Sequence, residues 1–315
     1  MSRRACTHLL IQRNATAAIG SYSEWMLQPD SVPRHQIVMT PIRSILVHLD
    51  GSTHAEARLR FAHHLARRHD AVLTALFAVA PQYLPLLPLK GDTLASRMAG
   101  RIDPGHRAHA YELVLRARTW GDVAVDWLEL QGEPVIPSFA RRALSADLLV
   151  LGQRDPRDAV GFDVPGDLTE AVIIGGGRPA LVVPFAGAAT PAPKTVLVAW
   201  KSTPECAHAL TASLPFLRAA SQVHLVCASD NVDEAFPAPV ELIPYLHLHG
   251  IDHVHEHRRL DDSGAGRAIL SLASETAADL IVMGCYGHTR ARELVLGGAS
   301  RAVLDSMCVP VLMAH

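Results

Sequence analysis

The sequence predicts an α/β protein of two tandem units, each a five-stranded, mainly parallel sheet with helices on both faces. Three observations lead to this prediction. The chain has 315 residues, about twice the length of a common single domain. Three motifs recur in the same order in both halves, which indicates a duplicated unit. Runs of Val, Leu and Ile without polar alternation are typical of parallel strands buried on both faces.

The duplication is visible when three pairs of segments are compared. They are SILVHLDGS at 44–52 with TVLVAWKST at 195–203, ADLLVLGQ at 146–153 with ADLIVMGC at 278–285, and RPALVVP at 178–184 with CVPVLMA at 308–314. We therefore expect the first unit over 42–186 and the second over 195–315. The segment GAATPAPK, 187–194, is a short proline-containing linker between them.

In the first unit, strand and helix patterns alternate. Residues 45–49 form an apolar strand, and Asp50-Gly51-Ser52-Thr53 after it offers N-cap residues. Apolar positions at helical spacing then predict a helix from Ala57 to about His69. Further strands are expected at 72–79, 123–130, 148–151 and 180–183.

The second unit repeats this order. Strands are expected near 196–199, 223–228, 253–258, 280–283 and 309–313, with a last helix from about 299 to 306. The proline-dense stretches PQYLPLLPLKGD, 81–92, and PAPVELIPYL, 237–246, predict loops in equivalent places of the two units. Proline inside a helix removes a hydrogen bond and clashes with the preceding turn.

Residues 1–41 differ from the rest, because they are polar, mixed and aperiodic. Met39 lies just before the first strong strand, so we expect a disordered extension or a start codon assigned too far upstream. The basic opening MSRRACTHLLIQRN leaves a mitochondrial-type leader as a further alternative. Its apolar stretch is too short for a secretory signal.

Composition excludes several classes of protein. Hydrophobic residues make up 49% and charged residues 19% of the chain, the balance of a packed globular protein. With 29 basic and 31 acidic side chains and no long basic run, nucleic acid is not an expected partner. The most apolar long window, 171–189, contains three consecutive glycines and two prolines, so no membrane span is expected. Five scattered cysteines indicate reduced thiols and a cytoplasmic location.

A glycine-rich stretch, GCYGHTRARELVLGGASRAVL, follows a strand at 284–304. Together with the repeat and the order of elements, it resembles a tandem universal stress protein over about 42–315. That resemblance implies Rossmann-like, adenine nucleotide alpha hydrolase-like domains with strand order 3-2-1-4-5. The family's nucleotide-binding pattern is Gly, two residues, Gly, nine residues, Gly, then Ser or Thr. Gly284, Gly287 and Gly297 fit it, but Gly298 occupies the Ser or Thr position, with Ser300 as a displaced substitute.

Such a loop also has a physical reason that does not depend on the family. In open parallel sheets, ligands bind beyond the carboxyl ends of the strands, where the strand order reverses. Glycines let main-chain N–H groups approach phosphate, and a helix N-terminus suits an anion. We expect ATP or another adenine nucleotide at Ala199, Trp200, Gly284, Gly287, His288, Gly297, Gly298 and Ser300, with Ala199 and Trp200 on the base side. Alternatively, the glycines only shape the turn.

The two units depart from the family pattern in different ways. The resemblance implies an Asp at the end of the first strand, facing ribose and adenine. Asp50 fits this in the first unit, whereas Lys201 replaces it in the second. The first unit has lost the glycine turn, and three aspartates that would repel phosphate replace it: Asp155, Asp158 and Asp163. The first unit is therefore expected to serve as scaffold or partner surface.

Two other features, a histidine-rich strand and a cysteine, indicate possible chemistry less strongly than the glycine-rich stretch. His253, His255 and His257 would share one face of a strand, where two imidazoles are close enough to share zinc, nickel or copper. No acidic or cysteine ligand is evident nearby, so solvated histidines with a mild pH response are preferred, and no metal is expected. Cys285 lies before a helix N-terminus that could lower its pKa. A cysteine in this position is more often a small packing residue, so packing is the preferred role and a redox role the alternative.

The sequence favours binding over catalysis. No G-x-S-x-G, H-E-x-x-H or P-loop motif is present, and the second unit offers no clear metal-holding carboxylate for ATP hydrolysis. We expect a stress-response protein whose units pair through strands 181–183 and 309–313 as an intramolecular pseudo-dimer, with a homodimer as a further assembly. The rival function is a stress protein that binds no nucleotide and acts through protein contacts. A weak ATPase is the third.

Overall fold

The computed structural model describes most of the chain beyond residue 41. The described residues are 42–80, 103–130, 134–158, 163–187, 189–229, 242–257, 260–261, 264–285 and 298–315. Every described residue belongs to one compact unit, Thr40–His315. The predicted extension 1–41 and the predicted loop 81–92 lie outside the described residues.

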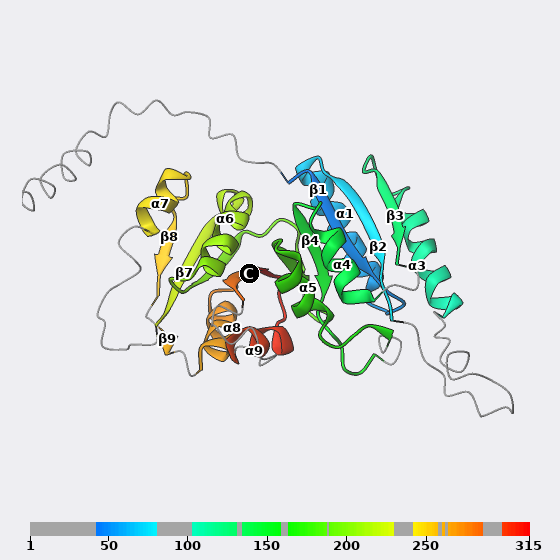
Figure 1. Ribbon diagram of the computed structural model, residues 1–315. Coiled ribbons are helices and arrows are strands. Elements are labelled where there is room, and N and C mark those ends of the chain that lie inside the picture. The colour runs from blue at the N-terminus through cyan, green and yellow to red at the C-terminus, as the bar shows by residue number, and fades with distance from the viewer. Residues whose placement is uncertain are drawn as a thin grey trace, which may run out of the picture. The chain divides into compact units, whose positions relative to one another are not determined.

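Strands and helices alternate through the first repeat (Figure 1). Its elements are β1 (Ser44–Leu49), α1 (Ala55–His69), β2 (Val72–Phe77), α3 (Pro104–Ala117), β3 (Val125–Glu129), α4 (Val135–Ala143), β4 (Leu148–Gly152), α5 (Leu168–Gly176) and β5 (Ala180–Val183). All five strands predicted from apolar runs are present. Asp103 begins α3 by accepting a hydrogen bond from the Gly105 backbone N–H at 2.7 Å.

The second repeat follows the same order. Its elements are β6 (Thr195–Trp200), α6 (Pro204–Ala219), β7 (Gln222–Ser229), α7 (Leu242–Leu248), β8 (Val254–Glu256), β9 (Leu260–Asp261), α8 (Ala265–Glu275), β10 (Leu280–Gly284), α9 (Gly298–Ser306) and β11 (Val311–Ala314). The prediction of a loop over 237–246 is wrong for its last part, which belongs to α7. Pro244 is tolerated because it lies in the first turn, where a backbone N–H has no partner within the helix.

The described strands form one sheet in the order β3-β2-β1-β4-β5-β11-β10-β6-β7-β8, with β9 beside β7. Within each repeat the order is 3-2-1-4-5 and the neighbouring strands run parallel. Between the repeats, β5 and β11 pair antiparallel, with Leu181 opposite Leu312. The predicted fold is therefore confirmed, and the two repeats form an intramolecular pair.

A shared apolar core accompanies this joined sheet. All four residues of β5 and all four of β11 are buried. One cluster of buried side chains contains Leu149 and Val182 of the first repeat together with Ile281 and Val303 of the second. Because burial of such side chains is the main stabilising term in folding, the repeats support each other.

Gly284, at the end of β10, allows close approach of the first turn of α6. A Cβ atom there would lie 2.6 Å from the backbone nitrogen of Cys206 and 2.8 Å from the carbonyl carbon of Glu205. We expect Gly284→Ala to lower the free energy of unfolding by about 1–3 kcal/mol through overpacking, as measured by urea denaturation. At Gly298 a Cβ would meet nothing within 4 Å, so Gly298→Ala is the matched control. Equal stability of the two variants would contradict this packing.

Candidate functional site

Each repeat has a crevice position where its strand order reverses. In the first repeat β1 lies between β2 and β4, and in the second β6 lies between β7 and β10. After β1 the chain continues to β2 on one side, and after β4 it continues to β5 on the other, so the two connections diverge and leave a crevice between them. The side chains there decide whether a ligand fits.

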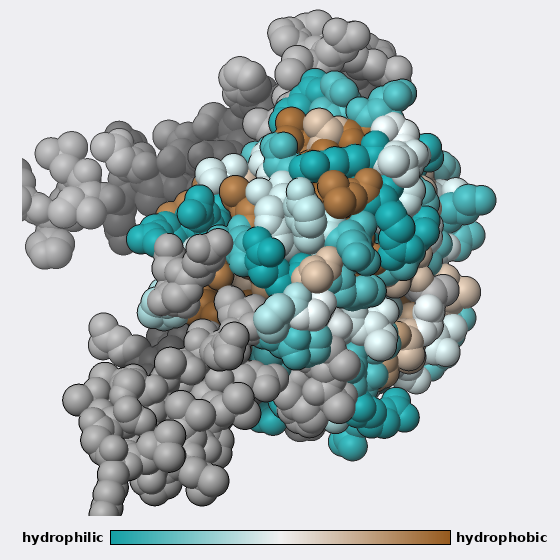
Figure 2. Space-filling model, turned by 90° about the vertical axis from the view of Figure 1, so that its right-hand side faces the viewer, coloured by the Kyte–Doolittle hydropathy of each residue, from teal (hydrophilic) through white to brown (hydrophobic). Residues whose placement is uncertain are grey.

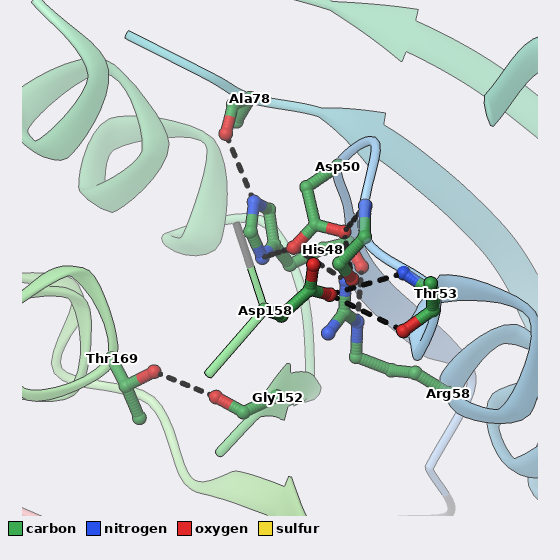
Figure 3. A network of polar contacts seen from close by, with 9 residues as sticks. His48, Asp50, Thr53, Arg58, Ala78, Gly152, Asp158 and Thr169 are labelled. Carbon is green, nitrogen blue, oxygen red and sulfur yellow. Dashed lines mark hydrogen bonds and ion pairs between the residues drawn. The ribbon is translucent and has the colours of Figure 1, made fainter. Parts of the chain in front are cut away.

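In the first repeat a buried ion pair occupies this position (Figure 3). Asp50 follows β1 directly and is 5% exposed. Its Oδ2 lies 2.9 Å from Nη2 of Arg58, which comes from α1. Its Oδ1 accepts hydrogen bonds from the Ser52 backbone N–H at 3.0 Å and hydroxyl at 2.5 Å. Arg58 Nε also donates to the His48 carbonyl at 2.7 Å. The two charges are therefore paired inside the protein, although Nη2 of Arg58 makes no hydrogen bond of good geometry among the described residues.

The electrostatics of this cluster follow from burial and neighbouring charge. Burial by itself would raise the pKa of Asp50, but Arg58, His48 and the hydrogen bonds from Ser52 outweigh it and hold that pKa well below its usual value. Burial lowers the pKa of His48 to about 4 despite the nearby Asp50. The neutral His48 ring donates from Nε2 to the Ala78 carbonyl at 2.9 Å.

A cavity of about 270 Å³ adjoins the ion pair. Its charged lining is mainly acidic. Burial raises the pKa of Glu170, and the negative charges of Asp167 and Asp305 raise it further. The acidic lining residues are Asp50, Asp155, Asp158, Asp167, Glu170 and Asp305, and the arginines are Arg58, Arg154 and Arg301. An excess of carboxylates repels phosphate. The volume is also below the roughly 300–1,000 Å³ of common ligand pockets.

The aspartates predicted to replace the glycine turn do not all line this cavity. Asp155 pairs with His54 at 3.1 Å, and Asp158 accepts from the Thr53 backbone N–H at 3.2 Å. Both line the cavity. Asp163 instead lies 3.0 Å from Nδ1 of His106. The loop that follows β4 is thus tied to the start of α1 by side-chain contacts.

Helix α9 of the second repeat closes the other side of the same cavity. Its residues Arg301, Leu304 and Asp305 line it. Gln153, just after β4, donates from Nε2 to the Leu304 carbonyl at 2.9 Å and accepts from the Phe185 backbone N–H at 3.2 Å. No sequence signal indicated these residues, because their proximity depends on how the repeats pair.

The second repeat presents a different strand end. Ala199 and Trp200 are half-buried at the end of β6, and Ala199 lies opposite Met283, next to Gly284. Gly298 begins α9, and Ser300 in its first turn is buried. These five predicted site residues are described. Gly287, His288 and Gly297 lie outside the described residues.

Two buried polar atoms near this strand end lack a hydrogen-bond partner among the residues that the structure describes. They are Nε1 of Trp200 and Oε2 of Glu205. Glu205 was missed by sequence reasoning, although it lies in the first turn of α6, two residues after the N-cap Thr203. An unpaired buried polar atom costs about 1–3 kcal/mol, so each calls for a partner.

Cys285 is a packing residue. Burial raises the pKa of its thiol, and the charge of Glu205 adds to this effect. Its Sγ donates to the Ala314 carbonyl at 3.3 Å. The hypothesis of a lowered pKa is therefore wrong, because desolvation outweighs any helix N-terminus. No disulfide joins the four described cysteines, Cys206, Cys227, Cys285 and Cys308.

The structure does not bring His253, His255 and His257 together as a three-histidine metal site. His255 lies in β8, with His253 and His257 on either side of that strand. Within the described residues no group of three or more His, Cys, Asp or Glu side chains is placed to hold a metal ion. In the same part of the chain, no helix is long and apolar enough to cross a membrane.

A duplicated, doubly wound sheet with a crevice position in each half defines a tandem Rossmann-like protein. The universal stress protein family matches residues 41–184 and 193–315. The chain therefore belongs to the universal stress protein family, in the tandem arrangement that the sequence predicts.

Solved structures agree with this fold. A universal stress protein from Archaeoglobus fulgidus is 17% identical over 86% of this chain and 96% of that chain, with a TM-score of 0.63. A protein of unknown function from Pseudomonas aeruginosa is 17% identical over 86% of this chain and 92% of that chain, with a TM-score of 0.55. Among curated proteins, none matches the sequence significantly.

Removing one partner of the buried ion pair should be costly. Arg58→Met leaves the Asp50 carboxylate buried without its counter-ion, and we expect a loss of about 3–5 kcal/mol in the free energy of unfolding. The double variant Asp50→Asn/Arg58→Met leaves no unpaired charge and should recover much of that loss. Urea denaturation of both single variants and the double variant gives the coupling. Additive losses would show that the two charges do not interact.

His48 should make stability depend on pH in a defined window. Its pKa is about 4 in the folded protein, against about 6.5 when unfolded. The unfolded chain therefore binds the extra proton first, and stability falls as the pH drops from about 6.5 toward 4, by on the order of 3 kcal/mol. Above about pH 6.5 His48 is neutral in both the folded and the unfolded chain, so it no longer makes stability depend on pH.

The variant His48→Gln tests this dependence, because the amide N–H can still donate to the Ala78 carbonyl. Subtracting its stability profile from that of the wild type removes the contribution of other histidines. We expect a flatter profile for the variant between pH 4 and 6.5. Parallel profiles would mean that His48 titrates normally in the folded state.

Proposed function

We propose that this protein acts in the cellular stress response and binds ATP or another adenine nucleotide in its second repeat. The binding residues proposed are Ala199, Trp200, Gly284, Gly287, His288, Gly297, Gly298 and Ser300. The first repeat, 42–186, serves as a scaffold and the second, 195–315, as the binding domain. This proposal concerns binding rather than turnover.

The observation that carries the proposal is that different side chains occupy the carboxyl ends of β1 and β6, which are equivalent strands of the two repeats. In the first repeat Asp50 and Arg58 occupy the crevice position with a buried ion pair. Eight residues after Lys201, as Arg58 is after Asp50, the second repeat has Ala209. An alanine cannot reach the strand end. The carboxyl end of β6 is accordingly half-buried, whereas that of β1 is buried.

The unpaired atoms near β6 match groups of a nucleoside. The indole N–H of Trp200 suits an acceptor such as a ring nitrogen of a base or a ribose oxygen. Oε2 of Glu205, which has no hydrogen-bond partner among the described residues, suits a hydroxyl or amino donor. Helix α9 begins at Gly298, and the N–H groups of its first turn favour phosphate.

The alternative is a stress protein that binds no nucleotide and acts through protein contacts. The packing of α6 against Gly284 favours it, because this close approach requires a glycine whether or not a nucleotide binds. Lys201 and Gly298 also depart from the family pattern.

On the face shown in Figure 2, hydrophilic residues predominate among the coloured ones and apolar residues form small groups. Small groups of this kind are normal on a monomer surface and do not indicate a partner site.

A cytoplasmic location and a pair formed within one chain complete the proposal. The lack of a disulfide among the four described cysteines is typical of a reducing compartment. The formal net charge of −2 provides no attraction for nucleic acid or an anionic membrane surface. A homodimer of tandem chains is a further assembly that is compatible with this pair.

The indole N–H of Trp200 offers a sharp test. Trp200→Phe keeps an aromatic ring but removes the donor, so we expect ATP affinity to fall about threefold to tenfold, the value of one hydrogen bond. The apo protein should lose no hydrogen-bond energy from this change, because Nε1 has no partner among the described residues. Calorimetric titration of ATP measures the affinity.

Trp127→Phe is the matched control, since Trp127 stacks on Phe77 in the first repeat and should not affect ATP. Gly287→Val is expected to abolish binding by placing side-chain atoms in the proposed turn. Nucleotide released on heat denaturation of the purified protein would support the same site. No binding at millimolar ATP by a folded wild type would reject the nucleotide proposal and favour protein partners.

A further inference from the structure

A pair of histidines bridges two neighbouring strands of the second repeat. His224 lies in β7, and His257 directly follows β8. Nδ1 of His224 is 2.9 Å from Nε2 of His257. The strands run parallel with His224 opposite His255, and the His257 backbone N–H donates to the Leu225 carbonyl at 2.8 Å. Both backbones are therefore fixed by the sheet.

The separation of the two nitrogens matches adjacent ligands of a metal ion. With metal–nitrogen bonds of about 2.05 Å, two nitrogens at a right angle are about 2.9 Å apart, and at a tetrahedral angle about 3.3 Å. Right-angled coordination by nitrogen and oxygen is typical of Cu(II) and Ni(II). The pair thus already has the spacing of a square-planar or octahedral chelate.

The surroundings orient the ring of His224 and favour its neutral form. The rings of His224 and His255 stack with centroids 5.2 Å apart and an interplanar angle of 27°. Burial, together with the two neighbouring imidazoles, lowers the pKa of His224, and a neutral imidazole is the form that binds metal. His224 and His257 are half-buried and His255 is exposed, so the pair is accessible to an ion from solvent.

We propose that Nδ1 of His224 and Nε2 of His257 form a two-imidazole chelate for Cu(II) or Ni(II), with water in the other coordination positions. Without metal, a single proton between the two nitrogens makes an N–H···N hydrogen bond. Metal binding transfers that proton within the ring or to solvent and leaves both lone pairs on the ion. The described residues hold no group of three metal-ligating side chains, so this chelate has two protein ligands.

Such an ion would fasten an edge of the sheet. Strand β8 comprises three residues and pairs with β7 through three residue pairs. A ligand that binds the folded state stabilises it by mass action. Metal binding here would therefore stabilise the β7–β8 pairing independently of any nucleotide in the crevice of the same repeat.

Titration of Ni(II) into the full chain, prepared without a histidine tag, tests the site. We expect His224→Gln and His257→Gln each to weaken Ni(II) binding at least about tenfold, because each removes one of two protein ligands. His253→Gln is the matched control, since His253 is exposed next to the same strand and should leave the affinity unchanged. Equal affinity in the wild type and in folded His224→Gln would overturn the site.

Electron paramagnetic resonance of the Cu(II)-loaded wild type keeps the test decisive if a variant does not fold. Coupling to two imidazole nitrogens at one equivalent of copper is the expected result, with one nitrogen remaining in His257→Gln. Coupling to a different number of nitrogens in the wild type would overturn the proposal. Absence of Cu(II) and Ni(II) binding by the folded wild type would do the same.

Discussion

The antiparallel pairing of β5 with β11 is the interaction on which the rest of the structure depends. Three residues of each strand face each other, from Ala180 opposite Met313 to Val182 opposite Val311. This pairing removes one open edge from each repeat and makes one sheet of two. It also brings α9 beside the cavity of the first repeat, where Gln153 binds the Leu304 carbonyl. The pairing therefore gives the first repeat a cavity wall that its own sequence does not encode.

The same strand end has opposite chemistry in the two repeats. At Asp50, desolvation of the carboxylate is offset by the Arg58 charge and by two hydrogen bonds from Ser52. A buried ion pair adds little net stability, but losing one partner is costly. The pair itself occupies the strand end of the first repeat, with the mainly acidic cavity beside it. The matching positions of the second repeat are Lys201 and Ala209, so an Asp–Arg pair cannot form between them. A duplicated fold can thus keep the geometry of a switch point while its chemistry differs.

The sequence predicted the strands, because buried parallel strands are continuous apolar runs, and the family resemblance supplied their order. Features that depend on register or on repeat pairing were not predictable. His224 meets His257 only because β7 and β8 align as they do. Arg58 reaches the strand end from a helix, and a periodicity pattern does not show where a long side chain points. For Cys285, the local helix-terminus argument was wrong because burial dominates its pKa.

Helix α9 connects the two crevices physically. Its first turn carries Gly298 and Ser300 at the proposed nucleotide site, and its later turns carry Leu304 and Asp305 into the cavity of the first repeat. A helix of nine residues is only about 14 Å long. An isolated second repeat would lose the Gln153 contact and expose the edge of β11, whose residues are all buried in the full chain. Nucleotide affinity measured on that fragment would therefore not be the affinity of the protein, because the end of the helix that the first repeat holds would be free.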